Sequence, residues 1–284
     1  MYVASFVQVR NVQAGAVGLS IGEAGEAGEG SRRLLFVHGF TGAKEEFTDL
    51  VDGFAAWGWH AATVDLRGHG QSDHPEGEAA YSLGAFAEDV LGAADALGWD
   101  RFSLVGHSMG GAVAQRLVLD HPRRVERLVL MSTFHGPLDI DPALVGLGVA
   151  IVKQGGIPAL AEALAARREM DPEAAAARAR IEQARPGYGE LADGKLLACA
   201  ADMWTAMAPR FPVWPDNLDE VAAIAVPTLV VVGDQDKTMR PHCERLADAI
   251  PGARFVLMDG VRHSPHLEAP DRCLAVLSDF LDAA

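Results

Sequence analysis

The segment from Gly106 to Gly111 contains Gly-x-Ser-x-Gly, a pattern that can present Ser108 as a nucleophile. An apolar run over 101–106 predicts a buried strand before it, and 111–119 predicts a helix after it. A serine on such a sharp turn stands clear of the sheet, and glycines flank it because side chains there would collide with neighbouring elements. The helix N-terminus aims backbone N–H groups at negative charge beside the serine. A chance match of a short motif is the alternative, and the flanking strand and helix disfavour it.

A serine nucleophile needs a base, an acid that orients the base, and donors for the oxyanion. Two later predicted strands end in suitable side chains: Asp234 and Asp236 follow the first, and His263 and His266 follow the second. Both segments lie at the strand edge that carries Ser108, which is where ligands bind in open parallel sheets. Either aspartate can be the acid and either histidine the base on position alone.

Two backbone N–H groups are candidates for an oxyanion hole. Residues 36–42 follow a short apolar run and open a helix, so the turn offers the N–H of Phe40. The second donor is the N–H of Met109, directly after the serine. Where such donors have been measured, each contributes roughly 3–4 kcal/mol to the stability of the transition state.

The elements that position these groups follow from hydrophobic periodicity. A leading hairpin is predicted over Tyr2–Arg10 and Ala16–Glu23, and an acidic, glycine-rich loop over 22–30. Strands and helices then alternate, which indicates a parallel sheet covered by helices. The predicted strands are 34–37, 61–64, 101–106, 125–131, 228–232 and 254–258, and the predicted helices are 45–57, 83–97 with Ser82 as N-cap, 111–119, 240–250 and 267–281.

The alternation stops between the strands at 125–131 and 228–232. Residues 135–217 are rich in alanine and predict helices over 158–168, 172–184 and 191–207. We therefore predict a core domain formed by 1–134 and 218–284, with 135–217 as a helical cap that roofs Ser108.

The motifs together resemble the α/β-hydrolase superfamily, in particular its esterases and lactonases. The resemblance implies the α/β-hydrolase fold, a mostly parallel eight-stranded sheet flanked by helices, with a helical cap. It spans nearly the whole chain and is carried by His38-Gly39-Phe40, Asp65 to Ser72, Gly106 to Gly110, Gly233 to Asp236, and Gly260 to His263 with Glu268 to Pro270.

The family pattern favours Asp236 over Asp234 as the acid and His263 over His266 as the base. His266 is then expected to cap the last helix. The chain departs from the family at Arg262, where glycine or alanine is frequent. A cation there would lower the pKa of the neighbouring imidazole or meet a substrate carboxylate.

Three further motif residues are expected to be structural. The resemblance implies that His38 and His69 hold loops, and Asp65, at the end of a strand, is expected to fix the loop 67–72.

The amino-acid composition limits the size of the core and the kinds of molecule that the protein is expected to bind. The chain has 284 residues, of which 49% are hydrophobic, and a net charge of −15 from 39 acidic and 24 basic residues. This is enough for a large core, and the negative field repels phosphate backbones, so nucleic acid is not an expected partner. The sequence leaves the oligomeric state, including a homodimer, open.

The sequence also indicates where the protein is located and whether it binds a metal. Three cysteines without C-x-x-C spacing suggest neither a disulfide framework nor a zinc site, and the histidines form no evident metal cluster. The first ten residues do not resemble a signal peptide, and the most apolar stretch, 143–152, is too short to span a bilayer. We expect a cytoplasmic protein without membrane insertion, metal or cofactor.

The substrate pocket is predicted from the segment 202–207. Met203 and Met207 lie four residues apart on one helical face with Trp204 beside them, and Trp214 follows. Such side chains offer adaptable apolar surface, although a cap core packed on itself explains them nearly as well. His107, next to the nucleophile, completes the expected substrate-binding set.

The sequence therefore predicts a serine hydrolase that cleaves a carboxylic ester or lactone of a small, largely apolar substrate through an acyl-enzyme intermediate. The same triad also serves carbon–carbon bond hydrolases, aminopeptidases, haloperoxidases or perhydrolases, lyases and acyltransferases, and these stay open. Dehalogenases and epoxide hydrolases are disfavoured, because they need aspartate at the position of Ser108. A hydrolase-fold ligand receptor with little turnover is the alternative of another class.

Overall fold

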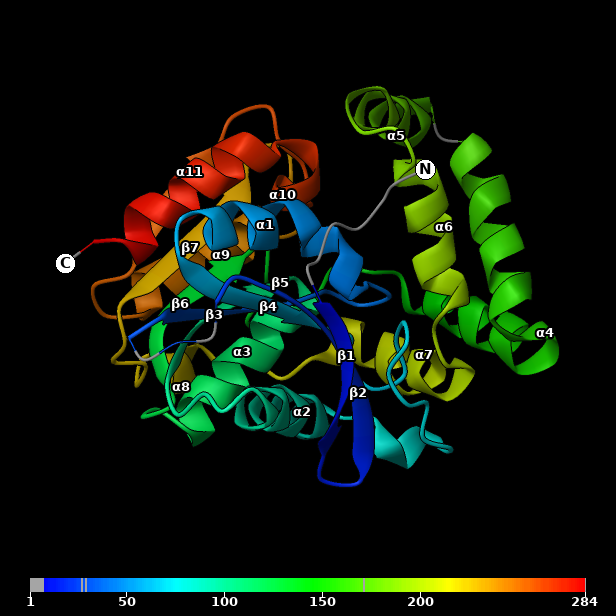
Figure 1. Cartoon of the computed structure of the whole chain (residues 1–284). Coiled ribbons are helices and arrows are strands. Elements are labelled where there is room, and N and C mark those ends of the chain that lie inside the picture. The colour runs from blue at the N-terminus through cyan, green and yellow to red at the C-terminus, as the bar shows by residue number, and fades with distance from the viewer. Residues whose placement is uncertain (1–7, 27, 29, 171, 284) are drawn as a thin grey trace.

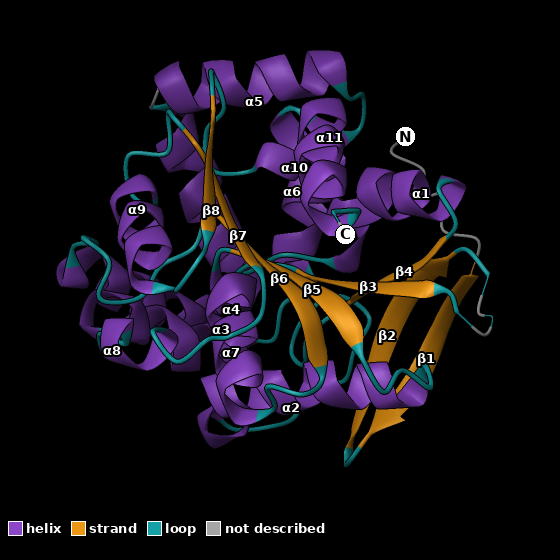
Figure 2. Ribbon diagram, turned by 90° about the vertical axis from the view of Figure 1, so that its left-hand side faces the viewer, coloured by secondary structure: helices purple, strands orange, loops and turns teal. Residues whose placement is uncertain are grey.

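A single eight-stranded sheet forms the centre of the protein. The computed structural model describes residues 8–283 except 27, 29 and 171. The strand order is β1-β2-β4-β3-β5-β6-β7-β8; β1–β2 and β2–β4 pair antiparallel and all other neighbours pair parallel (Figure 2). The strands are β1 (Gln8–Ala14), β2 (Val17–Ala24), β3 (Arg32–Val37), β4 (Trp59–Val64), β5 (Phe102–His107), β6 (Val125–Met131), β7 (Thr228–Gly233) and β8 (Arg254–Met258).

Helices cover both faces of the sheet. One apolar cluster joins the sheet to α2 (Leu83–Ala96), α3 (Met109–Asp120) and α9 (Arg240–Ala249), and a second cluster joins the other face to α1 (Thr48–Ala56) and α11 (Pro270–Leu281). The central strands β4, β5 and β7 are buried along their whole length, as strands covered on two faces must be. The predicted mostly parallel, eight-stranded α/β architecture is confirmed.

Most predicted elements lie within a few residues of the observed ones. Ser82 caps α2, because its Oγ accepts a hydrogen bond from the Ala85 N–H at 3.2 Å. The predicted helix 45–57 is a short 3-10 turn, η1 (Lys44–Phe47), followed by α1, and the predicted last helix is α10 (Pro265–Glu268) followed by α11.

The leading hairpin differs from its prediction. β1 begins at Gln8 and continues to Ala14, so most of the predicted strand Tyr2–Arg10 lies outside the described residues. The turn is Gly15-Ala16, where Gly15 has φ +59°, a conformation that glycine adopts without strain. β2 then runs to Ala24 and takes the first residues of the predicted acidic loop.

The helices between β6 and β7 lie together beside the sheet (Figure 1). We call residues 135–217 the insert. Its described elements are α4 (Pro142–Glu169), α5 (Pro172–Ala184), α6 (Tyr188–Leu197), α7 (Ala201–Met207) and the 3-10 helix η3 (Ala208–Val213); the short α8 (Leu218–Val221) follows and packs on α9. The single helix predicted over 191–207 is broken between α6 and α7, where the Ala200 N–H donates to the Gly68 carbonyl of the core at 2.8 Å.

The first half of α4 was not predicted as a helix. Asp141 caps it, because its Oδ1 accepts a hydrogen bond from the Ala143 N–H at 2.8 Å. By length and composition α4, with 28 residues, could cross a membrane, but Gly156 has φ 69° and ψ −170° and divides it into two arms. Each arm alone is shorter than the ~20 residues that a span needs.

Candidate active site

Ser108 lies in the sharp turn between β5 and α3 with φ 53° and ψ −119°, a strained conformation for a residue with a side chain. A Cβ on Gly106 would lie 2.3 Å from the Gly110 carbonyl oxygen, and a Cβ on Gly110 would lie 2.3 Å from that of Val37. The expected reason for the glycines is thus observed: the turn packs backbone against backbone. The turn holds the Ser108 hydroxyl above the sheet edge.

Ser108, His263 and Asp236 form one hydrogen-bonded chain. Ser108 Oγ and His263 Nε2 are 3.2 Å apart, and His263 Nδ1 lies 2.8 Å from Asp236 Oδ2. The other carboxylate oxygen of Asp236 accepts the Met239 N–H at 3.1 Å. Asp234 faces elsewhere, since its carboxylate accepts a hydrogen bond from the Gln235 side chain at 2.8 Å. The structure therefore brings Asp236, and not Asp234, to the imidazole.

The loop that carries His263 is fixed from both sides. The N–H groups of Arg262 and Ser264 donate to the Glu268 carboxylate at 3.0 and 2.9 Å. The His263 carbonyl accepts a hydrogen bond from His107 Nε2 at 2.9 Å. These hydrogen bonds fix the backbone on both sides of His263, so the position of its imidazole is set by the protein itself.

His266 does not cap the last helix. It is fully buried, and within the described residues neither ring nitrogen has a hydrogen-bond partner. Its ring stacks on Phe47 at 4.6 Å between centroids and meets His107 at the same distance. Burial, with the nearby Lys195 and His263, lowers its pKa well below 6.5, so it is a neutral packing group.

The two predicted oxyanion donors lie in turns next to Ser108. In the described part of the chain, neither the Phe40 N–H nor the Met109 N–H donates to a protein acceptor. Gly39 brings the first turn close, because a Cβ there would lie 3.0 Å from the Ser108 Cβ. Thr41 has φ +56°, so this turn is strained as well.

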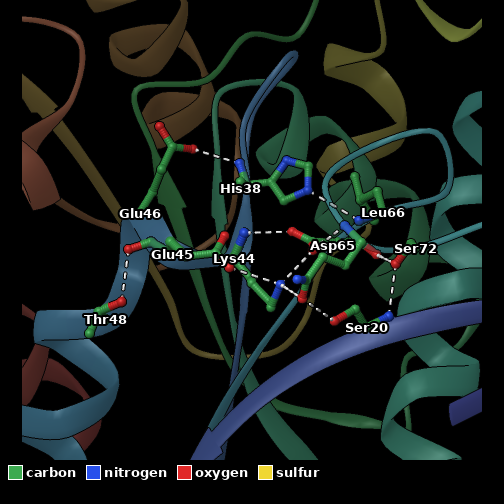
Figure 3. A network of polar contacts seen from close by, with 11 residues as sticks. Ser20, His38, Lys44, Glu45, Glu46, Thr48, Asp65, Leu66 and Ser72 are labelled. Atoms are coloured by element: carbon green, nitrogen blue, oxygen red, sulfur yellow. Dashed lines mark hydrogen bonds and ion pairs between the residues drawn. The ribbon is translucent and has the colours of Figure 1, made fainter. Parts of the chain in front are cut away.

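A buried polar network holds the turn that contains Phe40 (Figure 3). Asp65 accepts hydrogen bonds from the Lys44 N–H at 2.7 Å, Lys44 Nζ at 2.8 Å and the Gln71 N–H at 2.9 Å. His38 Nε2 accepts the Leu66 N–H at 3.1 Å. Asp65 thus fixes the loop 67–72 as expected, and it also fixes the turn after β3.

The other two motif histidines hold loops. His38 Nδ1 lies 2.8 Å from the Gly39 carbonyl oxygen, and His69 Nδ1 lies 3.0 Å from that of Arg67. Burial lowers the pKa of both imidazoles, so both are neutral at physiological pH.

A cavity of about 580 Å³ adjoins Ser108 and His263 between the core and the insert. Its wall is mostly apolar and comes from both parts. The core supplies Phe40 and Phe134, and the first residues of the insert supply Leu138 and Ile140. The insert helices supply Leu144, Val145, Gly148, Leu160, Leu164, Trp204, Ala208 and Phe211.

Only Trp204 of the predicted substrate-binding set lines this cavity. Met203 and Met207 are fully buried, and Met203 packs against Gly68 of the core, where an added Cβ would lie 2.8 Å away. Trp214 stacks on Phe211 with 5.8 Å between the ring centroids and does not line the cavity. The His107 side chain donates a hydrogen bond to the His263 carbonyl and does not line the cavity either. The aromatic and aliphatic wall residues were missed. Leu144 and Gly148 share the i, i+4 spacing of a helix face, which would have been a signal.

Three charged residues also line the cavity: Asp139, Asp141 and Arg167. Arg262, which departs from the family pattern, does not. It lies on a separate hollow with Arg272 and Glu268. Arg262 therefore does not line the cavity in which it was expected to meet a substrate carboxylate.

One buried ion pair joins the insert to the core next to the site. Lys195 of α6 donates to the Glu46 carboxylate of η1. Burial alone would raise the pKa of Glu46, but the charge of Lys195 and its hydrogen bond outweigh burial and hold the pKa below 4.5. Burial would likewise lower the pKa of Lys195, but Glu46 raises it above 10.5. Both groups are charged over the whole neutral range.

The cysteines offer no second nucleophile. Cys199, Cys243 and Cys273 are buried free thiols, and burial raises the pKa of each to about 12. Among the described residues, no group of three or more His, Cys, Asp or Glu side chains is arranged to hold a metal ion.

Comparison with known proteins finds similar sequences and similar folds. A sequence family described as alpha/beta hydrolase fold matches residues 32–148. Human "Protein ABHD8" is 28% identical over 256 residues, which cover 87% of this chain and 54% of that protein, so the chain spans about half the length of this relative.

Two solved structures are similar over nearly the whole chain. The enol-lactonase from Burkholderia xenovorans LB400 superposes with a TM-score of 0.82 at 23% identity, covering 96% of this chain and 100% of that one. Est816, described as an N-acyl homoserine lactone degrading enzyme, gives a TM-score of 0.74 at 28% identity, covering 95% and 100%. The first likeness concerns the fold alone.

Proposed function

The chain belongs to the α/β-hydrolase superfamily, and we propose that within it the protein is a serine hydrolase that cleaves a carboxylic ester or lactone. The observation that carries the proposal is the hydrogen-bonded chain Ser108–His263–Asp236, with bond lengths of 3.2 and 2.8 Å. This is the arrangement that makes a serine hydroxyl nucleophilic.

In the proposed mechanism, Ser108 Oγ attacks the carbonyl carbon while its proton moves to His263 Nε2. Asp236 accepts the Nδ1–H of the imidazole and stabilises the imidazolium that forms. The N–H groups of Phe40 and Met109 donate to the oxyanion. Collapse of the tetrahedral intermediate breaks the ester bond, and the proton on His263 goes to the leaving alkoxide.

Deacylation repeats these steps with water. His263 takes a proton from water as the oxygen attacks the acyl carbon of the Ser108 ester. The second tetrahedral intermediate releases the carboxylic acid, and the imidazolium returns its proton to Ser108 Oγ. A lactone gives a single hydroxy-acid product by the same route.

The apolar wall of the cavity supports a small, largely apolar substrate. In this proposal the insert, residues 135–217, acts as a cap, because its helices supply one side of the wall above Ser108. The similarity to Est816, a lactone-degrading enzyme, supports an ester or lactone as the bond cleaved.

The test uses a simple aryl ester, phenyl acetate. Ser108→Ala should lower kcat by roughly 10³–10⁶, by analogy with other triad knockouts, and leave the fold intact. A fluorophosphonate should label the wild type at Ser108 alone. Ser278→Ala, a serine of α11 far from the cavity, is the matched control and should hydrolyse and label normally. Normal turnover in Ser108→Ala, or labelling at another serine, would refute the proposal, and a wild type without turnover would favour the receptor alternative.

A further inference from the structure

The two arms of α4 enclose the cavity from two sides. Gly156 interrupts the helix, so the second arm turns away from the direction of the first (Figure 1). Leu144 and Gly148 reach the cavity from the first arm, and Leu160, Leu164 and Arg167 reach it from the second. Both arms thus contact whatever occupies the space above Ser108.

The second arm presents a graded row of side chains. Leu160, Leu164 and Arg167 are spaced by four and three residues, so they share one helix face. Leu160 is 2% exposed, Leu164 is 41% exposed, and Arg167 is exposed at the end of the row. At 1.5 Å per residue the row is about 10 Å long. A ligand that follows it from the depth of the cavity meets apolar surface first and a cation last.

Arg167 has no ionic partner among the residues that the structure describes. In the described part of the chain its guanidinium forms no ion pair and donates no hydrogen bond, whereas its neighbour Arg168 pairs with Asp193 at 3.3 Å. The helix dipole stabilises a cation in the last turn of α4. This interaction does not use the five N–H donors of the guanidinium, which remain available to a ligand. The net charge of −15 makes a bare cation at a cavity mouth a local exception.

The two carboxylates of the cavity are placed differently. Asp141 is engaged, because it caps α4 through the Ala143 N–H. Asp139 lies on the border of a second hollow, whose wall contains Lys237 and Arg245. Arg167 is therefore the charged group of the cavity best placed to bind a ligand of opposite charge.

We infer that the substrate carries a carboxylate remote from the bond that is cleaved, and that Arg167 binds it. This inference rests on the proposed function and narrows its substrate class to acid-bearing esters or lactones. The apolar part of the substrate lies along Leu160 and Leu164, and the guanidinium donates two hydrogen bonds to the carboxylate. Arg167 thus determines specificity and takes no part in the bond cleavage.

The experiment compares two pairs of esters, and in each pair one member carries a carboxylate and the other is neutral. One pair places the carboxylate on the acyl side (ethyl hydrogen suberate against ethyl octanoate), and the other on the leaving group (4-acetoxybenzoate against phenyl acetate). In Arg167→Gln, kcat/KM for the acid-bearing ester of one pair should fall by at least roughly ten-fold, because the variant loses the charge-assisted pair of hydrogen bonds to the carboxylate. The neutral esters should be unaffected. The preference should weaken at high salt, because Arg167 is exposed to solvent.

Arg168→Gln is the matched control, since it removes a neighbouring charge that is already paired with Asp193. It should leave all four rates unchanged. Equal losses of kcat/KM in both variants, or no loss of kcat/KM for either acid-bearing ester, would overturn the inference. The proposed function would still stand if the hydrolysis of phenyl acetate depended on Ser108. Faster hydrolysis of an amine-ended ester, ethyl 8-aminooctanoate, than of the suberate would overturn it in favour of Asp139.

A binding measurement keeps the inference testable if the wild type hydrolyses no ester. Titration of Ser108→Ala with suberate, followed by intrinsic tryptophan fluorescence, to which Trp204 in the cavity wall contributes, reports carboxylate binding without turnover. Arg167→Gln on the Ser108→Ala background should weaken this binding by at least roughly ten-fold. Unchanged affinity would overturn the inference whether or not the protein is a hydrolase.

Discussion

At the scale of single residues, two aspartates only two positions apart have different surroundings. Asp236 accepts the His263 Nδ1–H and the Met239 N–H, whereas Asp234 contacts the Gln235 side chain. Asp236→Asn presents a donor in place of the acceptor and favours the wrong imidazole tautomer, so kcat should fall by roughly 10⁴, as for the equivalent change in other Ser-His-Asp enzymes. Asp234→Asn should cost less than about two-fold, which initial rates with phenyl acetate will measure.

Unchanged folding must accompany that comparison. Both variants keep the size of the side chain, so their circular dichroism and Tm should lie close to the wild type. If Asp234→Asn were the more damaging change, the acid would be misassigned by two residues and the geometry of the site would need revision.

The three side chains of the proposed triad, which the structure brings within hydrogen-bond distance, could be singled out from sequence because their signals are local. Ser108 stands in a turn that needs Gly106 and Gly110 for reasons visible within five residues. His266 shows the limit of this reasoning: its position suggested a helix cap, but the side chain is buried against Phe47. Its environment comes from η1, more than two hundred positions away in the chain, and no local pattern reveals such a contact.

At the scale of elements, the core was predictable and the insert much less so. β6 and β8 begin and end where the hydrophobic pattern predicted. β6 is mostly buried, and β8, an edge strand that is largely exposed, still reads as an apolar run from Phe255 to Met258. The first arm of α4 is apolar without clear periodicity, since it faces a cavity and solvent rather than a uniform core. The cavity wall depends on the bend at Gly156, so most of its residues could not be predicted.

Among the contacts that join the insert to the core, the buried Lys195–Glu46 ion pair makes a prediction about pH. The pKa of Glu46 is held below 4.5, so its contribution to stability is complete above pH 4.5 and is lost as the pH falls through the folded-state pKa. The pKa of Lys195 is raised above 10.5, so its contribution is complete below pH 10.5 and is lost at higher pH. The pair therefore stabilises the fold fully across the neutral range.

Lys195→Met leaves the Glu46 carboxylate buried without its cation. The free energy of unfolding should fall by about 3 kcal/mol at pH 8. The deficit should shrink toward pH 5, because the buried carboxyl of the variant can then bind a proton. The double variant Lys195→Met/Glu46→Leu should recover most of the loss, since no buried charge remains. Urea unfolding at both pH values measures these differences.

An exposed ion pair between the same parts of the molecule supplies the control. Lys153 of α4 lies 3.5 Å from Glu78, and both side chains are about half exposed. Lys153→Met should change stability by less than about 1 kcal/mol at either pH. A loss in Lys195→Met that did not depend on pH would show that packing of the long side chain, and not its charge, holds the insert.

At the scale of the whole molecule, the site exists only where the core and the insert meet. The sheet brings the ends of β3, β5, β7 and β8 to one edge, which positions the proposed oxyanion donors, nucleophile, acid and base. The insert leaves the sheet after β6 at the same edge and returns before β7. The topology therefore places the insert beside the proposed active site, and under the proposed function its side chains select the substrate.

Variants of Trp204 and Trp214 test whether a side chain of the insert only stabilises the fold or also contacts the substrate. Both indoles are buried in one aromatic cluster, but Trp204 lines the cavity beside Phe40, whereas Trp214 lies behind the wall on Phe211. Replacement of either by alanine should lower the stability by about 3–5 kcal/mol. Trp204→Ala should also change kcat/KM unequally along a series of ethyl esters from acetate to decanoate, because the enlarged cavity favours longer chains. Trp214→Ala should scale every rate equally, and a uniform profile in Trp204→Ala would mean that the substrate does not touch the insert at this residue.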